Sequence, residues 1–171
     1  MSVAGALARI PVGVVVERPK ARSQWIDFVW QPVTVLAGVP ETAPWTQLSA
    51  DGEATTFYAG AAEIALYRTE TGNYLNNLNA PVPSLWIALR PTGVEPPYEV
   101  IAVTADPAEG EALSEPSTDV VEAVPMPPTI REMVAAFVAE HHVERPFFKR
   151  QRDRADPEAL ARRGPMRKDR E

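Results

Sequence analysis

IPVGVVVE, residues Ile10–Glu17, is the stretch of this sequence that decides its fold. β-Branched side chains dominate it, and such residues favour extended backbone. Its apolar residues recur at every second position, which places them on one face of a strand. Those residues are Ile10, Val12, Val14 and Val16. We therefore predict a strand that buries one face and ends at Arg18-Pro19-Lys20.

The neighbouring segment, Trp25–Leu36, places Ile26, Phe28 and Trp30 on one face at the same period of two. Pro32 lies within this segment and has no N–H to donate to a strand ladder, so we expect a bulge or an edge position there. A short helix capped by Ser23 is the alternative for the first half of the segment.

Farther along the chain, short apolar runs predict more strands, and segments rich in Pro, Gly, Asn or acidic residues predict the loops between them. The expected strands are two within Glu53–Arg68, broken around Gly60, and one each in Ser84–Arg90, Tyr98–Thr104 and Val120–Val124. The expected loops are Gly38–Gly52, the Asn-rich segment Thr69–Pro83 and the acidic segment Ala105–Asp119.

One helix is predicted, over Ile130–His142, because its apolar residues recur at helical spacing after a pair of prolines. The apolar stripe comprises Ile130, Met133, Val134, Phe137, Val138 and His141. Thr129, followed three residues later by Glu132, matches the pattern of a capping box at the start of the helix.

Together these elements predict a mainly β protein of the α+β class with one C-terminal helix. We expect a bent antiparallel sheet or a small barrel flanked by that helix. The 18 prolines in 171 residues agree with short strands joined by rigid loops. The expected organisation is an acidic β-rich domain over residues 1–144, closed by the helix at 130–142, followed by a basic, partly disordered tail over 145–171.

The charge of the chain changes sign near residue 144. Ten of the 17 Lys and Arg residues but only five of the 23 Asp and Glu residues lie in the tail, 145–171. The tail therefore carries a net charge of +5, and residues 1–144 carry −11. This asymmetry indicates a folded domain with an interaction tail.

Several classes of chemistry and location are disfavoured by composition. Cysteine is absent, which excludes disulfides, thiol nucleophiles and thiolate metal sites. No run approaches the ~20 apolar residues that a membrane-spanning helix needs. The apolar start, Met1–Val16, is interrupted by Arg9 and Pro11 and does not match a signal peptide. We therefore expect a cytoplasmic protein with no membrane partner and no cofactor.

The only two histidines, His141 and His142, are adjacent at the end of the predicted helix. Adjacent helical residues point about 100° apart, so both cannot bind one metal ion from a regular helix. The favoured interpretation is a helix-end histidine facing the C-terminal dipole, with metal or acid–base chemistry as the alternative. No nucleophile elbow or glycine-rich phosphate loop is present. The sequence thus nominates no catalytic residue and no metal ligand, and an enzyme is the less favoured class.

The start of the tail is the first candidate binding site, because aromatic and cationic residues often dominate protein interfaces. The candidate partner-binding residues are Arg145, Phe147, Phe148, Lys149, Arg150 and Arg152. A solvated tail that packs back on its own acidic domain is one alternative. Nucleic-acid binding is another, and the acidic charge of residues 1–144 disfavours it.

A second candidate site is a ligand pocket lined by aromatic rings and an amide-rich loop. Its candidate residues are Trp25, Trp30, Trp86 and Asn76, and Trp45 is a further candidate. The alternative interpretation is that the tryptophans belong to the core and that Asn73–Asn79 is an ordinary turn.

Three strings of this sequence resemble a known family. They are Ile10–Arg18, the segment from Trp25 to Val33, and His141–Arg150 (HHVERPFFKR). On these strings the chain resembles a proteobacterial family known as domain of unknown function 3305, over most of Ile10–Arg163. Members of that family are often encoded beside formate dehydrogenase components, and some carry a molybdopterin-cofactor biosynthesis label. The resemblance implies an accessory role near a molybdenum-dependent formate dehydrogenase, and it supplies no catalytic residues.

The resulting hypothesis is a non-enzymatic, cytoplasmic accessory or adaptor protein that docks a protein partner through its aromatic and basic C-terminal segment. The partner implied by the resemblance is a formate dehydrogenase or its maturation machinery. A binding protein or enzyme for a small ligand, such as a nucleotide or a molybdopterin, is the first alternative. Nucleic-acid binding through the tail is the second.

Overall fold

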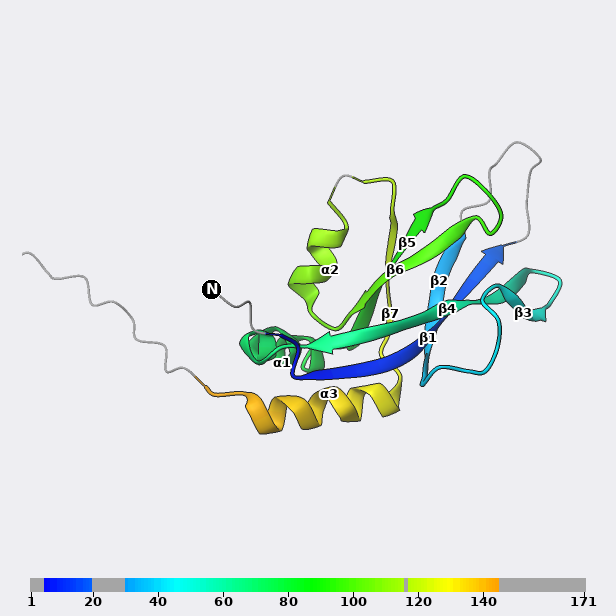
Figure 1. Cartoon of the computed structure of the whole chain (residues 1–171). Helices are drawn as coiled ribbons and strands as arrows, with labels where there is room; N and C mark the ends of the chain where they lie inside the picture. The colour runs from blue at the N-terminus through cyan, green and yellow to red at the C-terminus, as the bar shows by residue number, and fades with distance from the viewer. Residues whose placement is uncertain (1–4, 20–29, 116, 145–171) are drawn as a thin grey trace, which may run out of the picture.

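The computed structural model describes residues 5–19, 30–115 and 117–144. Within them lie seven strands, three α-helices and one short 3₁₀ helix, η1 (Arg68–Glu70). The strands are β1 (Ala8–Pro19), β2 (Gln31–Ala37), β3 (Thr46–Ala50), β4 (Ala54–Leu66), β5 (Ser84–Pro91), β6 (Tyr98–Thr104) and β7 (Val120–Pro125). The helices are α1 (Thr71–Leu78), α2 (Pro107–Leu113) and α3 (Pro128–His141) (Figure 1). The tail predicted at 145–171 lies outside the described residues.

The strands form two antiparallel sheets that pack around a shared core. One sheet has the order β2-β1-β4-β3, and the other has the order β6-β5-β7. β4 lies against β6 and β2 lies against β7, but no strand ladder joins the two sheets in the described part of the chain. The prediction of a mainly antiparallel β protein is therefore confirmed, whereas a closed barrel does not form.

β1 is one of the two inner strands of the larger sheet, because it pairs with β2 along one side and with β4 along the other. Its alternating residues Ile10, Val12, Val14 and Val16 are all buried, as their period of two predicts. Burying one such side chain contributes roughly 1.5–3 kcal/mol. All four side chains belong to the hydrophobic core shared by the two sheets.

Two irregularities bend this sheet. Opposite Val15 and Val16, the register on β2 shifts from Thr34 to Pro32, so the predicted bulge at Pro32 is present, on an edge strand. On β4 the register shifts next to Gly60, whose φ of +140° few other residues adopt. β1 keeps pairing on both sides of that shift. The expected break at Gly60 is therefore a bulge within one continuous strand, and the prediction of two short strands was wrong.

The prediction of a single helix was also wrong, because the Asn-rich segment expected as a loop contains α1. Asn77 of α1 is 3% exposed, and its amide donates to the carbonyl oxygens of Ser84 (2.8 Å) and Ala105 (2.9 Å). Its side-chain oxygen accepts from the Ser84 N–H at 2.9 Å. One buried amide thus ties the helix to two distant segments, and this stabilisation outweighs the weak helix propensity of Asn.

The acidic segment expected as a loop likewise contains α2. Asp106 caps this helix by accepting from the N–H groups of Ala108 and Glu109, and Pro107 occupies its first turn. Gly110 of α2 lies directly on Trp86 of β5. The expected loop at Gly38–Gly52 contains strand β3, which is exposed along its whole length and so has no buried face for a sequence pattern to reveal.

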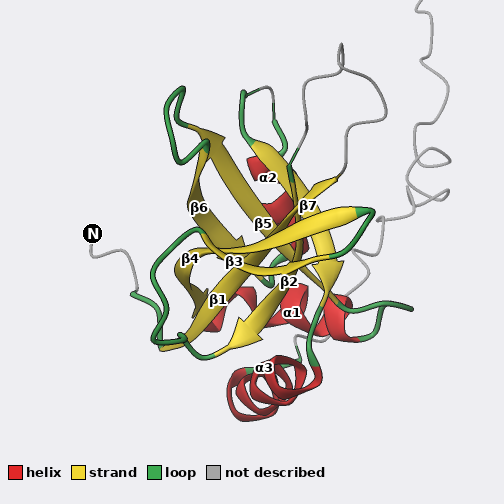
Figure 2. Ribbon diagram, turned by 90° about the vertical axis from the view of Figure 1, so that its right-hand side faces the viewer, coloured by secondary structure: helices red, strands yellow, loops and turns green. Residues whose placement is uncertain are grey.

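Helix α3 confirms the predicted C-terminal helix, with two differences at its start and on its face. It begins at Pro128 with Pro127 at the N-cap, so Thr129 is inside the first turn and no side-chain cap forms; the predicted capping box was wrong. Four of the stripe residues are buried, but Met133 is 44% exposed. The buried face packs on α1, where the Tyr74 and Phe137 rings lie 6.2 Å apart. In Figures 1 and 2, α3 lies along one side of the sheets, below β1.

We predict that Gly110→Ala lowers the free energy of unfolding by roughly 1–3 kcal/mol, because an added Cβ would lie 2.3 Å from Cγ of the Trp86 ring. Urea unfolding of both proteins measures the change. Gly72→Ala on α1 is the matched control, since nothing lies within 4 Å of its Cβ position. A loss of stability in the control equal to that in Gly110→Ala would contradict the close contact.

The buried hydroxyl of Tyr74 leads us to expect that the protein loses stability at alkaline pH. Its side chain is 1% exposed and its hydroxyl accepts the Tyr67 N–H at 3.0 Å, and burial raises the pKa of Tyr74 from 10.0 to about 12. The folded state therefore holds this proton more tightly than the unfolded state. The stability gained is complete below pH 10 and is lost as the pH rises from 10 through 12.

Tyr74→Phe should be less stable than wild type at neutral pH by roughly 1–3 kcal/mol, because the Tyr67 N–H loses its partner. Between pH 10 and 12 the wild type should lose more stability than the variant. Denaturant unfolding across this pH range measures both effects. Parallel losses in the two proteins would assign the alkaline transition to other groups.

Candidate functional site

Four aromatic side chains from separate parts of the chain meet at one place in the fold, and we call them the Trp30 cluster. Trp30 lies directly before β2, Trp45 directly before β3, Phe57 on β4 and Tyr98 at the start of β6. Trp30 is the shared member. The two sheets therefore both contribute to this cluster.

The rings contact one another in the tilted and edge-on geometries that aromatic pairs favour. The Trp30 ring centroid is 5.0 Å from that of Phe57, 5.6 Å from that of Trp45 and 6.3 Å from that of Tyr98. The guanidinium carbon of Arg18 lies 5.4 Å from the ring centroids of both Trp30 and Phe57. Such cation–π contacts contribute about 0.5–1 kcal/mol at exposed positions, so Arg18 helps to hold these rings.

Trp45 reaches the cluster through an unusual backbone conformation. Its φ is +70°, in the left-handed region, which costs a residue other than glycine of order 1–3 kcal/mol. The Trp45 N–H donates to the carbonyl oxygen of Tyr58, and the edge of its ring contacts Trp30. The backbone hydrogen bond to Tyr58 and the ring contact with Trp30 together hold Trp45 in this conformation.

A cleft of about 820 Å³ opens beside the cluster, between Trp30 and the turn that joins β5 to β6. Its lining residues are Trp30, Pro91, Gly93, Val94, Glu95, Pro97 and Tyr98. The turn is closed by a hydrogen bond from the Thr92 N–H to the Pro97 carbonyl oxygen at 3.0 Å, and Gly93 has a φ of +74°. Val94 is 69% exposed at the rim. We call this feature the aromatic cleft.

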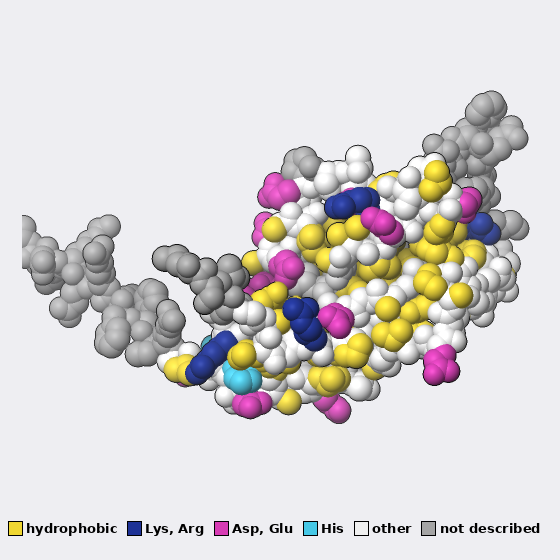
Figure 3. Space-filling view, viewed as in Figure 1, with side chains coloured by type: hydrophobic (Ala, Val, Ile, Leu, Met, Phe, Trp, Pro, Cys, Tyr) yellow, Lys and Arg dark blue, Asp and Glu magenta, His cyan; other side chains and the backbone are white. Residues whose placement is uncertain are grey.

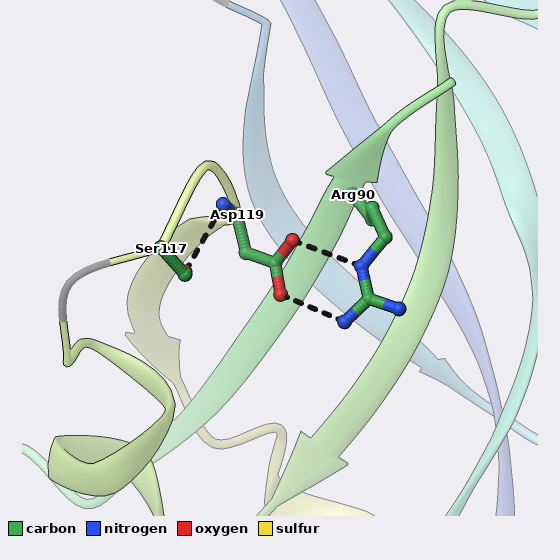
Figure 4. Close-up of polar contacts among 3 residues, drawn as sticks. All are labelled: Arg90, Ser117 and Asp119. Carbon is green, nitrogen blue, oxygen red and sulfur yellow. Dashed lines mark hydrogen bonds and ion pairs between the residues drawn. The ribbon is translucent and has the colours of Figure 1, made fainter.

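An ion pair anchors the base of the same turn (Figure 4). Arg90, the residue before Pro91, donates from Nε to Oδ1 of Asp119 at 3.1 Å and from Nη2 to Oδ2 at 3.2 Å. Asp119 lies directly before β7, and its N–H donates to the Ser117 hydroxyl. The hydrogen bonds and charge of Asp119 raise the pKa of the Arg90 guanidinium. This two-point contact joins the end of β5 to the start of β7.

The cleft offers apolar and aromatic contact area together with one carboxylate, that of Glu95. Within the described ranges, no three His, Asp or Glu side chains are placed to hold a metal ion. The buried polar side chains there all have hydrogen-bond partners within the fold: those of Thr71, Asn77 and Thr104 bond to other elements, and that of Asp106 caps α2. The geometry therefore supports contact with a surface that is part apolar and part polar.

The sequence-predicted pocket residues lie in different parts of the fold. Trp30 lines the aromatic cleft, Trp86 is covered by α2 through Gly110, and Asn76 is exposed on α1. Trp25 lies outside the described residues, as do the partner-binding candidates Arg145, Phe147, Phe148, Lys149, Arg150 and Arg152. Sequence reasoning missed Arg18, Phe57 and Tyr98 as cleft neighbours, because nothing in their local patterns indicates that they converge.

The comparisons with known proteins identify a family but no characterised relative. A family model described as "Protein of unknown function (DUF3305)" matches residues 11–152. No curated protein and no solved structure matches the chain. None of the helices in the part of the chain that the structure describes is long and apolar enough to cross a membrane.

A double-mutant cycle should measure the Arg90–Asp119 pair. We predict a favourable coupling energy between Arg90→Gln and Asp119→Asn in urea unfolding, decreasing with added salt. The Arg side chain is 52% exposed but the Asp side chain only 11%, so screening is partial. The control pair, Arg9–Glu63 at 3.4 Å, is more than half exposed on both sides and should couple more weakly. Equal coupling energies in the two cycles would show that the two-point contact of Arg90 with Asp119 does not strengthen this ion pair.

Proposed function

The chain belongs to the DUF3305 family, and we propose that it is a non-enzymatic accessory protein that docks on a protein partner. The observation that carries this proposal is the aromatic cleft. Tyr and Trp are enriched among the residues that dominate protein interfaces, where they supply large contact areas at low entropic cost. Trp30 and Tyr98 are half-buried in the cleft, so part of each ring is held by the protein and part is available to a partner.

The surroundings of the cleft support contact with a large surface. Val94 projects from its rim with most of its side chain exposed. In Figure 3 hydrophobic side chains form a broad band across the middle and right of the face shown, while acidic side chains gather on the α2 side. An apolar band bordered by charge is the usual arrangement of a binding surface.

The tail would add a second contact by a different mechanism. Phe147 and Phe148 would supply buried apolar area, and Lys149, Arg150 and Arg152 would steer the chain onto an acidic surface. The tail carries +5 against −11 on residues 1–144, so it would prefer a partner that is acidic. The same distribution disfavours nucleic acid, because the acidic domain would repel a phosphate backbone.

The partner that we propose is a molybdenum-dependent formate dehydrogenase or its maturation machinery, in the cytoplasm. This assignment rests on the resemblance described from the sequence. The chain would then act on the assembly of the enzyme rather than on formate.

A second candidate function is binding of a small planar ligand of the nucleotide or molybdopterin type. The volume of the cleft favours it, since about 820 Å³ is within the range of roughly 300–1,000 Å³ that ligand pockets occupy. Such a ring system could stack on Trp30 or Tyr98.

Binding of the full chain to a purified molybdenum-dependent formate dehydrogenase, measured by biolayer interferometry, tests the proposal. We expect Val94→Asp to weaken binding about tenfold or more, because it places a charge on the apolar rim. Val82→Asp is the matched control, since Val82 is 59% exposed but does not line the cleft, and it should bind as wild type.

Phe147→Ala with Phe148→Ala should also weaken binding and leave the melting temperature unchanged. Wild-type affinity in both the rim variant and the tail variant would overturn the docking proposal. A thermal shift with a nucleotide or a molybdopterin that is lost in Val94→Asp would instead support the second candidate.

A further inference from the structure

A second pocket, of about 640 Å³, lies where the C-terminal end of α3 meets η1 and the start of α1. We call it the α3-end pocket. Its lining residues are Arg68, Thr69, Thr71, Gly72, His141, His142 and Val143. Both histidines of the chain and one arginine therefore line one pocket. Figure 3 shows a His side chain beside a Lys or Arg side chain at this end of the molecule.

The His142 ring is held in a defined position. Its Nδ1 lies 3.0 Å from Oγ1 of Thr71, a residue that is itself buried and within 3.4 Å of the Arg68 carbonyl oxygen. His142 is also the C-cap residue that directly follows α3, and its N–H donates to the Val138 carbonyl oxygen at 2.8 Å. A ring fixed through Nδ1 keeps Nε2 as a second hydrogen-bonding atom in a constant direction.

The His141 imidazole and the Arg68 guanidinium line the pocket together with the His142 imidazole. The His141 ring packs on Phe137, with ring centroids 4.5 Å apart, and is half-buried. Arg68 is exposed in η1, so its guanidinium is accessible. Gly72 has no side chain, and nothing lies within 4 Å of the place where a Cβ would be, so this wall is open.

From this arrangement we infer that the α3-end pocket binds a tetrahedral oxyanion of the phosphate-ester class. A guanidinium binds such anions through two parallel hydrogen bonds, and protonated imidazoles add charge-assisted donors. The Thr69 hydroxyl also lies on the lining, where it donates to Glu70 at 3.3 Å. The site adds a small-anion ligand to a protein whose proposed function concerns the aromatic cleft, and it does not depend on that function.

Two carboxylates near the pocket would repel a bound anion and so weaken its binding. Glu140 lies 3.6 Å from Nε2 of His141 and is 75% exposed, and Glu70 accepts hydrogen bonds from Asn73 and Thr69. An imidazole side chain gains its positive charge within the range pH 5–8. Anion binding should therefore tighten as the pH falls from 8 to 6.

The test is an NMR titration of the full, ¹⁵N-labelled chain with sodium sulfate and, separately, with inorganic phosphate. Sulfate keeps its charge across pH 6–8, so a change in its affinity reports on the protein alone. We expect saturable shifts at the Gly72 amide and at the His142 side chain, with sulfate affinity at least severalfold higher at pH 6 than at pH 8. The phosphate titration at pH 6 should shift the same signals.

Arg68→Gln should weaken binding about tenfold. Arg9→Gln is the matched control, because Arg9 of β1 is also exposed but pairs with Glu63 of β4. His142→Gln should reduce the pH dependence of binding. Unchanged thermal unfolding of the three variants would show that they fold. Shifts confined to residues 145–171, shifts that do not saturate, or equal affinity in Arg68→Gln and Arg9→Gln would overturn the inference.

Discussion

Most of this structure depends on the pairing of β1 along both of its sides. A strand with two hydrogen-bonded neighbours can bury a whole face only if its apolar residues alternate without interruption, and Ile10 to Val16 satisfy that condition. The bulges next to Pro32 and Gly60 bend the neighbouring strands around this axis without breaking the ladders. The smaller sheet and α3 then pack on the same core, since Ile87, Leu89 and Val134 belong to one hydrophobic cluster with the residues of β1.

The buried polar groups place the helices on this β framework. Asn77 fixes α1 to the first residue of β5 and to the residue after β6, and Asp106 fixes the start of α2. Each of these groups is satisfied by backbone atoms, so removing it would leave unpaired donors or acceptors in the interior. These buried polar groups thus explain how the helices are positioned. Because their hydrogen bonds are made within the fold, we look for binding sites on the surface.

The surface carries two sites of different chemistry. The aromatic cleft is made of rings and a proline-containing turn, and the ion pair of Arg90 and Asp119 holds the base of that turn. The α3-end pocket is made of imidazole, guanidinium and hydroxyl groups at the point where the chain leaves its last helix. We propose that the first site contacts a protein partner and that the second binds a small anion, so that a single domain would respond to a partner and to a ligand separately.

The sequence alone determined the elements whose evidence is local. β1, β5, β6, β7 and α3 have apolar periodicity, and their predicted ranges agree with the observed ones within a few residues. The bulge and the edge position at Pro32 were also correctly predicted, because a proline has no N–H to donate to a strand ladder, whatever the neighbouring strands are.

Only the tertiary structure decided the rest. α1 and α2 are stabilised by contacts with distant residues, such as Asn77 with Ala105 and Gly110 with Trp86, and β3 exists because β4 offers it an edge. The aromatic cleft and the α3-end pocket arise in the same way, from side chains far apart in sequence. The periodicity of apolar residues shows which face of a helix or strand is buried. Whether side chains far apart in sequence meet at one site depends on how the elements pack against one another. No local sequence pattern contains that information.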